Sequence, residues 1–206
     1  MDEATIKQGL KILAKQDPDI RRALKQIGQP PPRIRPIGFE TFLATIVGQQ
    51  LSTKAAHAIL TRVLALMGSS TPQALLALSD EQLRAAGLSY RKIEYIKGLA
   101  NAINEGSFNA NKLADMSDQE AINAITRLRG LGRWSAEIYL MFSLQRQDIF
   151  PADDLALLVA LGKLKGLGDK PTPAQARMLV MHWAPWRSVG SLFLWHYYHA
   201  TPLVGR

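Results

Sequence analysis

The sequence contains no cysteine, which excludes disulfide scaffolds, cysteine-based zinc sites, iron–sulfur clusters and cysteine nucleophiles. No apolar run approaches the roughly 18 residues of a membrane-spanning helix. Acidic Asp2 and Glu3 stand where a secretory signal would be positively charged. We therefore expect a soluble intracellular protein, in the cytoplasm or nucleoid of a bacterium or the nucleus of a eukaryote, that does not engage membranes.

Acidic residues are few relative to basic ones. The 206 residues include 17 Asp and Glu against 25 Lys and Arg, which gives a formal net charge of +8. A positive surplus of this size favours a polyanionic partner such as nucleic acid. Hydrophobic residues make up 47% of the chain, enough for one large domain or two small lobes with a real core, so intrinsic disorder of the whole chain is excluded.

The periodicity of apolar residues predicts an all-α fold. Apolar side chains recur at helical spacing along most of the chain, and no segment alternates convincingly with period two. Side-chain acceptors ahead of the apolar runs predict helix starts at Asp17, Ser52, Thr71, Ser79, Ser117 and Thr172. Glycines that can adopt a left-handed conformation predict helix ends at Gly28, Gly68, Gly87, Gly106 and Gly168.

Two irregular stretches divide the chain. Four prolines within residues 29–36 exclude a helix there and predict an extended strap. A second break at residues 147–152 precedes a helix expected to begin near Asp153. We therefore expect a central helical lobe of residues 37–149 and a second lobe built from residues 1–36 and 150–206, because the strap allows the N-terminal helices to fold back.

The segment Leu128–Ala136 could bind an anion. Gly130 and Gly132 bracket Leu131 between two predicted helices, so the backbone can turn tightly and approach another surface closely. Backbone amides at the start of the second helix attract phosphate, which favours DNA as a ligand. The flanking arginines add positive charge: Arg127, Arg129 and Arg133. An ordinary helix–helix turn with glycine caps explains the same spacing.

Two adjacent acids and a group of aromatic rings are the remaining candidates for chemistry. Asp153 and Asp154 precede an apolar helix, and N-capping explains one of them. A carboxylate at a helix N-terminus is favoured in its ionised form and can stabilise a cationic transition state or activate water. The C-terminal run Trp183–Tyr198 is rich in aromatic residues, most of them expected in the core and one or two in a cleft. The four histidines lack metal-site spacing.

Taken together, the ordered motifs resemble the helix-hairpin-helix, Gly/Pro and catalytic-Asp superfamily of DNA base-excision glycosylases, in particular the 3-methyladenine DNA glycosylase II branch in its compact form. The resemblance covers most of the chain. It is carried by Asp17-Pro18, by residues 46–56 (IVGQQLSTKAA), 87–92 (GLSYRK) and 128–136 (LRGLGRWSA), by the acidic pair, and by residues 185–188 (PWRS). It implies two helical lobes flanking a cleft for DNA and the extruded base, with the helix-hairpin-helix at about residues 126–140.

The resemblance also implies roles for individual residues. Asp154 matches the catalytic carboxylate, and Asp153 is its neighbour and candidate cap. Trp134 stands where relatives that also cut the strand carry a nucleophilic lysine, so no AP-lyase activity is expected. Trp134 and Trp195 match positions that line the base pocket, and Gln50 matches the residue that plugs the duplex after base extrusion.

Further pocket and backbone positions follow from the same resemblance. Ile138 and Leu155 stand where some relatives add pocket aromatics. The hairpin residues Gly130, Leu131, Gly132 and Arg133 match the element that grips DNA phosphate. The resemblance implies a monovalent cation held by the backbone carbonyls of Thr126, Leu128 and Leu131, and neither a catalytic metal nor a cofactor.

The function implied is that of a monomeric, monofunctional glycosylase of base excision repair. It would extrude alkylated purines such as 3-methyladenine, and also 7-methylguanine, from double-stranded DNA and hydrolyse the N-glycosidic bond to leave an abasic site. One alternative keeps this chemistry and acts on deaminated or oxidised bases. Another is a non-catalytic helix-hairpin-helix protein that only binds DNA, and a third is a helical interaction module with incidental positive charge.

Overall fold

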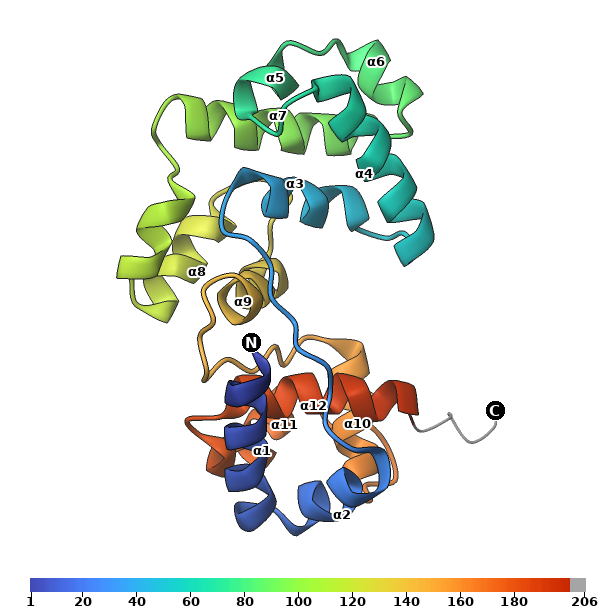
Figure 1. Cartoon of the computed structure of the whole chain (residues 1–206), viewed down its shortest axis with the longest axis vertical. Coiled ribbons are helices and arrows are strands. Elements are labelled where there is room, and N and C mark those ends of the chain that lie inside the picture. The colour runs from blue at the N-terminus through green and yellow to red at the C-terminus, as the bar shows by residue number, and fades with distance from the viewer. Residues whose placement is uncertain (201–206) are drawn as a thin grey trace. The chain divides into compact units, whose positions relative to one another are not determined.

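The computed structural model describes residues 1–200, and every regular element within that range is a helix (Figure 1). The expected all-α fold is therefore confirmed. In chain order the elements are α1 (Glu3–Gln16), α2 (Pro18–Ile27), α3 (Phe39–Gly48), α4 (Thr53–Met67), α5 (Pro72–Leu76), α6 (Asp80–Ala85), α7 (Tyr90–Asn104), the 3₁₀ helix η1 (Ala110–Asp115), α8 (Asp118–Thr126), α9 (Arg133–Phe142), α10 (Leu155–Leu164), α11 (Pro173–Leu179), the 3₁₀ helix η2 (Met181–Trp183) and α12 (Arg187–Ala200).

Local capping explains where these helices begin and end. At all six predicted starts the named side chain accepts a hydrogen bond from a backbone N–H of the first turn, which confirms those predictions. Four of the five predicted end glycines follow a helix with positive φ. The end predicted at Gly168 is wrong, because α10 already ends at Leu164 and Gly166 takes the left-handed conformation with φ 64°.

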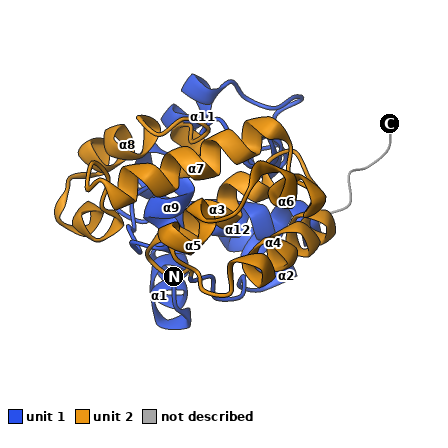
Figure 2. Cartoon of the chain, turned by 90° about the horizontal axis from the view of Figure 1, so that it is seen from above, with its two compact units in different colours: residues 1–34, 137–206 blue, residues 35–136 orange. Residues whose placement is uncertain are grey.

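The chain forms two compact units, coloured separately in Figure 2. Unit 1 consists of residues 1–34 and the chain from residue 137 onward, and unit 2 of residues 35–136. The expected functional lobes, residues 37–149 and residues 1–36 with 150–206, stay a prediction. No helix in the described part of the chain is long and apolar enough to cross a membrane.

In unit 1, the N-terminal helices α1 and α2 pack on α12, which also packs against α10. The approach of α1 to α12 is close at Gly9, where an added Cβ would lie 2.7 Å from the Trp186 ring and 2.8 Å from Val189. The strap of residues 29–36 contains no helix, as expected. It is tied to the N-terminus by two bonds: the Arg33 N–H donates to the Met1 carbonyl at 3.0 Å, and the Met1 amino group donates to the Arg33 carbonyl.

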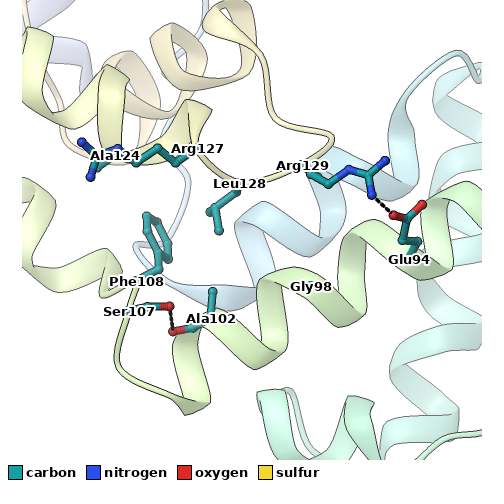
Figure 3. Close-up of a pocket in the computed structure, with 9 residues that line it drawn as sticks. All are labelled: Glu94, Gly98, Ala102, Ser107, Phe108, Ala124, Arg127, Leu128 and Arg129. Atoms are coloured by element: carbon teal, nitrogen blue, oxygen red, sulfur yellow. Dashed lines mark hydrogen bonds and ion pairs between the residues drawn. The ribbon is translucent and has the colours of Figure 1, made fainter.

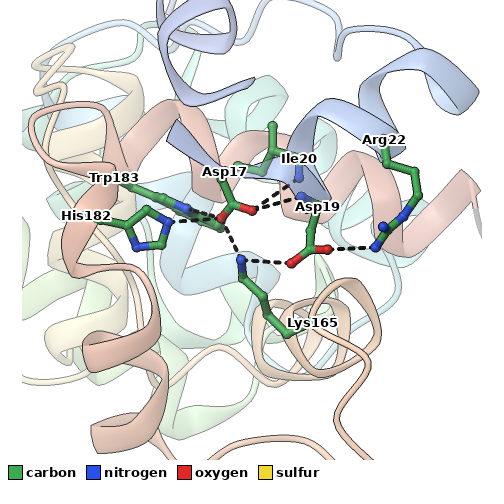
Figure 4. A network of polar contacts seen from close by, with 7 residues as sticks. All are labelled: Asp17, Asp19, Ile20, Arg22, Lys165, His182 and Trp183. Atoms are coloured by element: carbon green, nitrogen blue, oxygen red, sulfur yellow. Dashed lines mark hydrogen bonds and ion pairs between the residues drawn. The ribbon is translucent and has the colours of Figure 1, made fainter. Parts of the chain in front are cut away.

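A buried carboxylate joins three elements of unit 1 (Figure 4). The Asp17 side chain is fully buried at the N-cap of α2 and accepts hydrogen bonds from Trp183 Nε1 at 2.7 Å and Lys165 Nζ at 2.6 Å. His182 Nε2 lies 3.1 Å from the same oxygen. Burial alone would raise the pKa of Asp17, but the hydrogen bonds from Lys165 and Trp183 outweigh it and hold the pKa below its ordinary value. This network accounts for the Asp17-Pro18 motif as a structural element.

In unit 2, α3 packs on α4 and α7, while α5 and α6 pack on α7. The core includes an edge-to-face contact between Phe42 and Phe108, whose ring centroids are 5.4 Å apart. This packing places two short connections: the turn between α3 and α4, which carries Gln50, and the hairpin between α8 and α9. Both connections contain residues that the sequence singles out.

Candidate active site and nucleic-acid interface

The structure brings together Asp154 and Trp195, two residues predicted for the active site. Asp154 is the N-cap of α10, and its Oδ1 accepts hydrogen bonds from the Leu157 backbone N–H at 2.9 Å and from the Trp195 indole N–H at 3.2 Å. The candidate cap role of Asp153 is wrong, because Asp154 is the cap. Asp153 is instead exposed, with its Oδ2 3.9 Å from Arg177 Nη2. The carboxylate of Asp154 is half-buried and held in place by two donors.

An aromatic face adjoins this carboxylate. The ring of Trp195 is half-buried and lies 5.8 Å from that of Phe142, at an interplanar angle of 41°. Phe142 is fully buried. The Arg33 guanidinium carbon lies 4.4 Å from the Phe142 centroid and 5.8 Å from that of Trp195. Sequence reasoning missed Phe142 and Arg33, because neither belongs to a motif and only the packing of unit 1 brings them to Trp195.

The other predicted pocket residues lie in different surroundings. Trp134 and Ile138 are four residues apart on α9, which puts them on the same side of that helix. Trp134 is 41% exposed and Ile138 only 4%. Leu155, the first residue of α10 beside Asp154, is 62% exposed. Their roles in binding a base stay predictions.

Gln50, the predicted duplex plug, lies exposed in the turn between α3 and α4. Its φ is +57°, a left-handed conformation that costs a non-glycine residue about 1 kcal/mol or more. Such a conformation persists only where neighbouring contacts hold it, and non-glycine residues of this kind are concentrated at functional sites. The contacts that hold this turn are therefore informative.

Two side chains hold the turn that carries Gln50. Lys92, in the first turn of α7, donates from Nζ to the carbonyl oxygens of Val47 and Gln49, each at 2.7 Å. Partial burial lowers the pKa of Lys92. The side-chain amide of Gln49 donates to the Gly130 carbonyl at 2.6 Å and links the turn to the hairpin. Sequence reasoning included both residues in motifs but did not assign them these contacts.

The two hairpin glycines differ in what requires them. Gly130 has φ +88°, and a Cβ there would overlap the ring of Tyr95, so the fold itself requires glycine. Gly132 is exposed, and apart from its neighbours in the chain no described residue comes within 4 Å of the point where its Cβ would be. Leu131 between them is buried. Internal packing therefore accounts for Gly130 and leaves the surface at Gly132 open to close approach from outside.

The hairpin leads directly into α9, whose first hydrogen bond runs from the Ala136 N–H to the Gly132 carbonyl at 3.1 Å. First-turn amides of any α-helix have no intrahelical acceptor and favour an anion. Arg133 and Arg127 are exposed on either side of the turn. Arg129 is paired with Glu94, which partly neutralises its charge. The hairpin thus offers the amides and charges that suit a phosphate.

The carbonyls implied for a monovalent cation belong to this hairpin. Thr126 is the last residue of α8, where carbonyls lack intrahelical donors. The Leu128 carbonyl accepts the Leu131 N–H at 3.1 Å and keeps a second lone pair. Neutral carbonyl oxygens suit a hard cation, so these residues are compatible with a bound monovalent cation. The cation site itself stays a prediction. Among residues 1–200 no cluster of three or more His, Asp or Glu could hold a metal ion.

Unit 2 also contains an open groove of about 550 Å³ (Figure 3). One side is the face of α7 formed by Glu94, Gly98 and Ala102, and Phe108 and Leu128 supply apolar surface. Its only acidic lining residue, Glu94, is paired with Arg129. The carboxylate of this groove is therefore held by an arginine, whereas that of Asp154 accepts a hydrogen bond from the Trp195 indole N–H.

Comparisons of the sequence and of the fold with known proteins both find DNA repair enzymes. The model of the HhH-GPD superfamily of base excision DNA repair proteins matches residues 43–185. DNA-3-methyladenine glycosylase 1 of Schizosaccharomyces pombe is 34% identical over 161 residues, covering 76% of this chain and 71% of the relative. Residues 43–185, which the family model matches, include the turn of Gln50, the hairpin and Asp154.

Two solved structures share the fold over nearly the whole chain. A 3-methyladenine DNA glycosylase of Schizosaccharomyces pombe in complex with abasic DNA has a TM-score of 0.83 and 30% identity, with 91% of this chain and 95% of that one covered. A DNA-3-methyladenine glycosidase from Bacillus halodurans has a TM-score of 0.80 and 33% identity, with 92% and 88% covered.

Proposed function

Because the chain belongs to the HhH-GPD superfamily of base excision DNA repair proteins, we propose that it is a monofunctional DNA glycosylase that removes alkylated purines from duplex DNA. The observation that carries the proposal is the pairing of Asp154 with Trp195, a held carboxylate beside an aromatic face. A protein that only binds DNA has no need of that pair. The named relatives are 3-methyladenine glycosylases, which supports alkylated purines as the substrate class.

Binding would use the two connections of unit 2. The hairpin receives a phosphate through amides at the start of α9, where exposed Gly132 allows close approach. Extruding a nucleotide costs a few kcal/mol and leaves a gap in the stack. Gln50, projecting from its strained turn, fills that gap. The hydrogen bond between Gln49 and Gly130 fixes the position of Gln50 relative to the phosphate-binding hairpin.

Base recognition would depend on charge. Alkylation at a purine ring nitrogen gives the base a positive charge, which weakens the glycosidic bond and favours stacking on indole faces by roughly 0.5–2 kcal/mol. Trp195 supplies one such face beside Asp154, and half-exposed Trp134 is the second candidate. Undamaged purines lack this charge and gain less from the same surface.

Bond cleavage would use Asp154 as the catalytic carboxylate. As the base departs with the bonding electron pair, positive charge develops on the sugar, and the carboxylate stabilises it. A water oxygen then bonds to the anomeric carbon, and its surplus proton passes to Asp154 or to solvent, leaving an abasic site. Position 134 is tryptophan, so no lysine amine is present there to form a Schiff base and cut the strand.

The test is release of free bases from methylated duplex DNA by the natural protein and by Asp154→Asn. Asparagine caps helices as well as aspartate and retains the oxygen that accepts from Leu157 and Trp195, so this variant removes charge while keeping the fold. We expect the natural protein to release methylated purines without nicking the strand, and the variant to be slower by ~10²-fold or more. Asp153→Asn, the matched control, should retain activity.

Other results would assign another function. Release of hypoxanthine or 8-oxoguanine in place of methylated purines would keep the glycosylase and change its lesion. Tight DNA binding without release of any base would support a non-catalytic DNA-binding protein. Normal turnover by Asp154→Asn would exclude Asp154 as the catalytic carboxylate.

A further inference from the structure

A positively charged side chain covers the aromatic face beside Asp154. The guanidinium of Arg33 lies over the rings of Phe142 and Trp195 within the range of cation–π contacts. The Trp195 indole donates its N–H to Asp154. The guanidinium therefore lies over a ring that is hydrogen-bonded to the candidate catalytic carboxylate. All four residues belong to unit 1.

The position of Arg33 is set by the backbone. Its N–H and carbonyl both bond to Met1, and the strap around it is stiffened by Pro30, Pro31, Pro32 and Pro36. The side chain therefore starts from an anchored point close to the rings. A guanidinium that leaves the rings stays near them, because its backbone remains tied.

We propose that Arg33 is a specificity-determining residue that occupies the binding position of the extruded base and must be displaced before a base can stack on Trp195. This inference rests on the proposed function for its biological meaning. An alkylated purine and a guanidinium share the properties that this surface binds, a flat shape and a positive charge. One ring face accommodates one such group at a time.

Displacement and charge have separate effects on selectivity. The free energy needed to move Arg33 off the rings is the same whichever base arrives, so displacement lowers the apparent affinity for every base and discriminates between none. Repulsion between the displaced, still anchored Arg33 and the base acts only on a cationic base. Arg33 therefore raises the KM for all bases, and raises it more for cationic than for neutral ones.

The inference is tested with Arg33→Gln, which removes the cation and retains a polar side chain. Excision is measured for 7-methylguanine, which is cationic in DNA, and for neutral hypoxanthine in the same duplex sequence. We expect a lower KM for both lesions and an increase of roughly three- to tenfold in kcat/KM for 7-methylguanine relative to hypoxanthine, the range expected for repulsion between two solvent-screened charges a few ångströms apart. Arg33→Lys, which restores a stacking cation, should return the ratio to that of the natural protein.

A matched control separates this effect from the loss of one positive charge. Arg22→Gln makes the same change of net charge in unit 1, at an exposed residue paired only with Asp19 among the ion pairs of the described chain. It should leave the ratio unchanged. If Arg33 merely anchors the strap, Arg33→Gln will lower kcat/KM equally for both lesions along with the unfolding temperature, and that result overturns the inference.

A binding measurement tests Arg33 independently of catalysis. Tryptophan fluorescence is titrated with the cationic nucleoside 7-methylguanosine and with neutral guanosine. Arg33→Gln should bind 7-methylguanosine roughly three- to tenfold more tightly than the natural protein does, with a smaller gain for guanosine. If Arg33→Gln and the natural protein bind 7-methylguanosine equally well, the proposed role of Arg33 is overturned, even if methylated purines are excised. If Arg33→Gln binds it more tightly but neither protein excises any base, the base-binding position on Trp195 is supported and the glycosylase proposal is rejected.

Discussion

The side-chain amide of Gln49 donates a 2.6 Å hydrogen bond to the carbonyl oxygen of Gly130, 81 residues away. This bond joins the turn that carries Gln50 to the hairpin that precedes α9. Lys92 also holds this turn, because its Nζ donates to the carbonyls of Val47 and Gln49. The residue proposed to fill the DNA stack and the element proposed to grip its backbone are therefore parts of one hydrogen-bonded assembly in unit 2.

Loss of this link should uncouple extrusion from binding. In Gln49→Ala the Gly130 carbonyl loses its partner, at a cost of about 1 kcal/mol in stability. The turn is then less firmly held. We expect excision from duplex DNA to fall several-fold while affinity for undamaged duplex stays within about twofold. The measurement pairs single-turnover excision with fluorescence of a 2-aminopurine placed opposite the lesion.

A single-stranded substrate is the control for Gln49, since it has no gap to fill. Activity on it should be the same in Gln49→Ala and the natural protein. An equal loss on both substrates would show that Gln49 affects the active site in general rather than the turn of Gln50.

The two hairpin glycines should respond differently to substitution. Gly130→Ala forces a Cβ into the Tyr95 ring at a positive φ, so we expect destabilisation by at least ~1–2 kcal/mol. Gly132→Leu meets open space among the described residues and should unfold at nearly the natural temperature. Its affinity should fall about equally for damaged and undamaged duplex, because the side chain blocks the approach of a phosphate. Unchanged DNA affinity in a folded Gly132→Leu protein would remove the hairpin from the interface.

Trp195 should contribute through its N–H as well as through its ring. Trp195→Phe keeps an aromatic face but removes the donor that orients Asp154. We expect kcat to fall by roughly tenfold, because misplacing a catalytic group by a fraction of an ångström is costly, with a smaller change in KM. Steady-state kinetics on one methylated duplex measures this split. A rise in KM with unchanged kcat would assign Trp195 to base stacking alone.

The Asp17 network should make stability depend on pH. The pKa of Asp17 is held below its ordinary value of 3.8, so the folded state favours the ionised form. Its contribution is therefore fully present above pH 3.8 and is lost as the pH falls through the lower pKa of the folded protein. Asp17→Asn keeps an N-cap but leaves Lys165 without its buried partner, which should cost about 3 kcal/mol near neutral pH.

Chemical denaturation at several pH values measures this difference. The gap in unfolding free energy between Asp17→Asn and the natural protein should narrow as the pH drops below 3.8. Asp19→Asn is the control, since Asp19 pairs with the same lysine at 3.1 Å but is partly exposed, and it should cost less near neutral pH. A gap that does not change with pH would mean that the Asp17 charge contributes nothing to stability.

Short-range features of this protein could be predicted because each depends on residues a few positions apart. A capping side chain and the amide it satisfies are separated by two or three residues, so the serines and threonines before apolar runs located the helix starts. The failure at Gly168 has the same origin, because Gly166 offers the same local signal two residues earlier. The acidic pair before α10 stood out for the same reason, but only the family resemblance singled out Asp154, and the cap expected at Asp153 is Asp154 instead.

Long-range contacts required the tertiary structure. Asp154 and Trp195 are 41 residues apart, and the contact of Arg33 with Phe142 exists only because the N-terminal segment packs within unit 1. The side chains of Gln49 and Lys92 bond to residues 43 to 81 positions away, so local spacing could not reveal their roles. Residue types and local spacing decided which groups could carry the chemistry, whereas the burial of apolar helix faces decided which of those groups meet, because burial depends on the whole fold and not on neighbours in the chain.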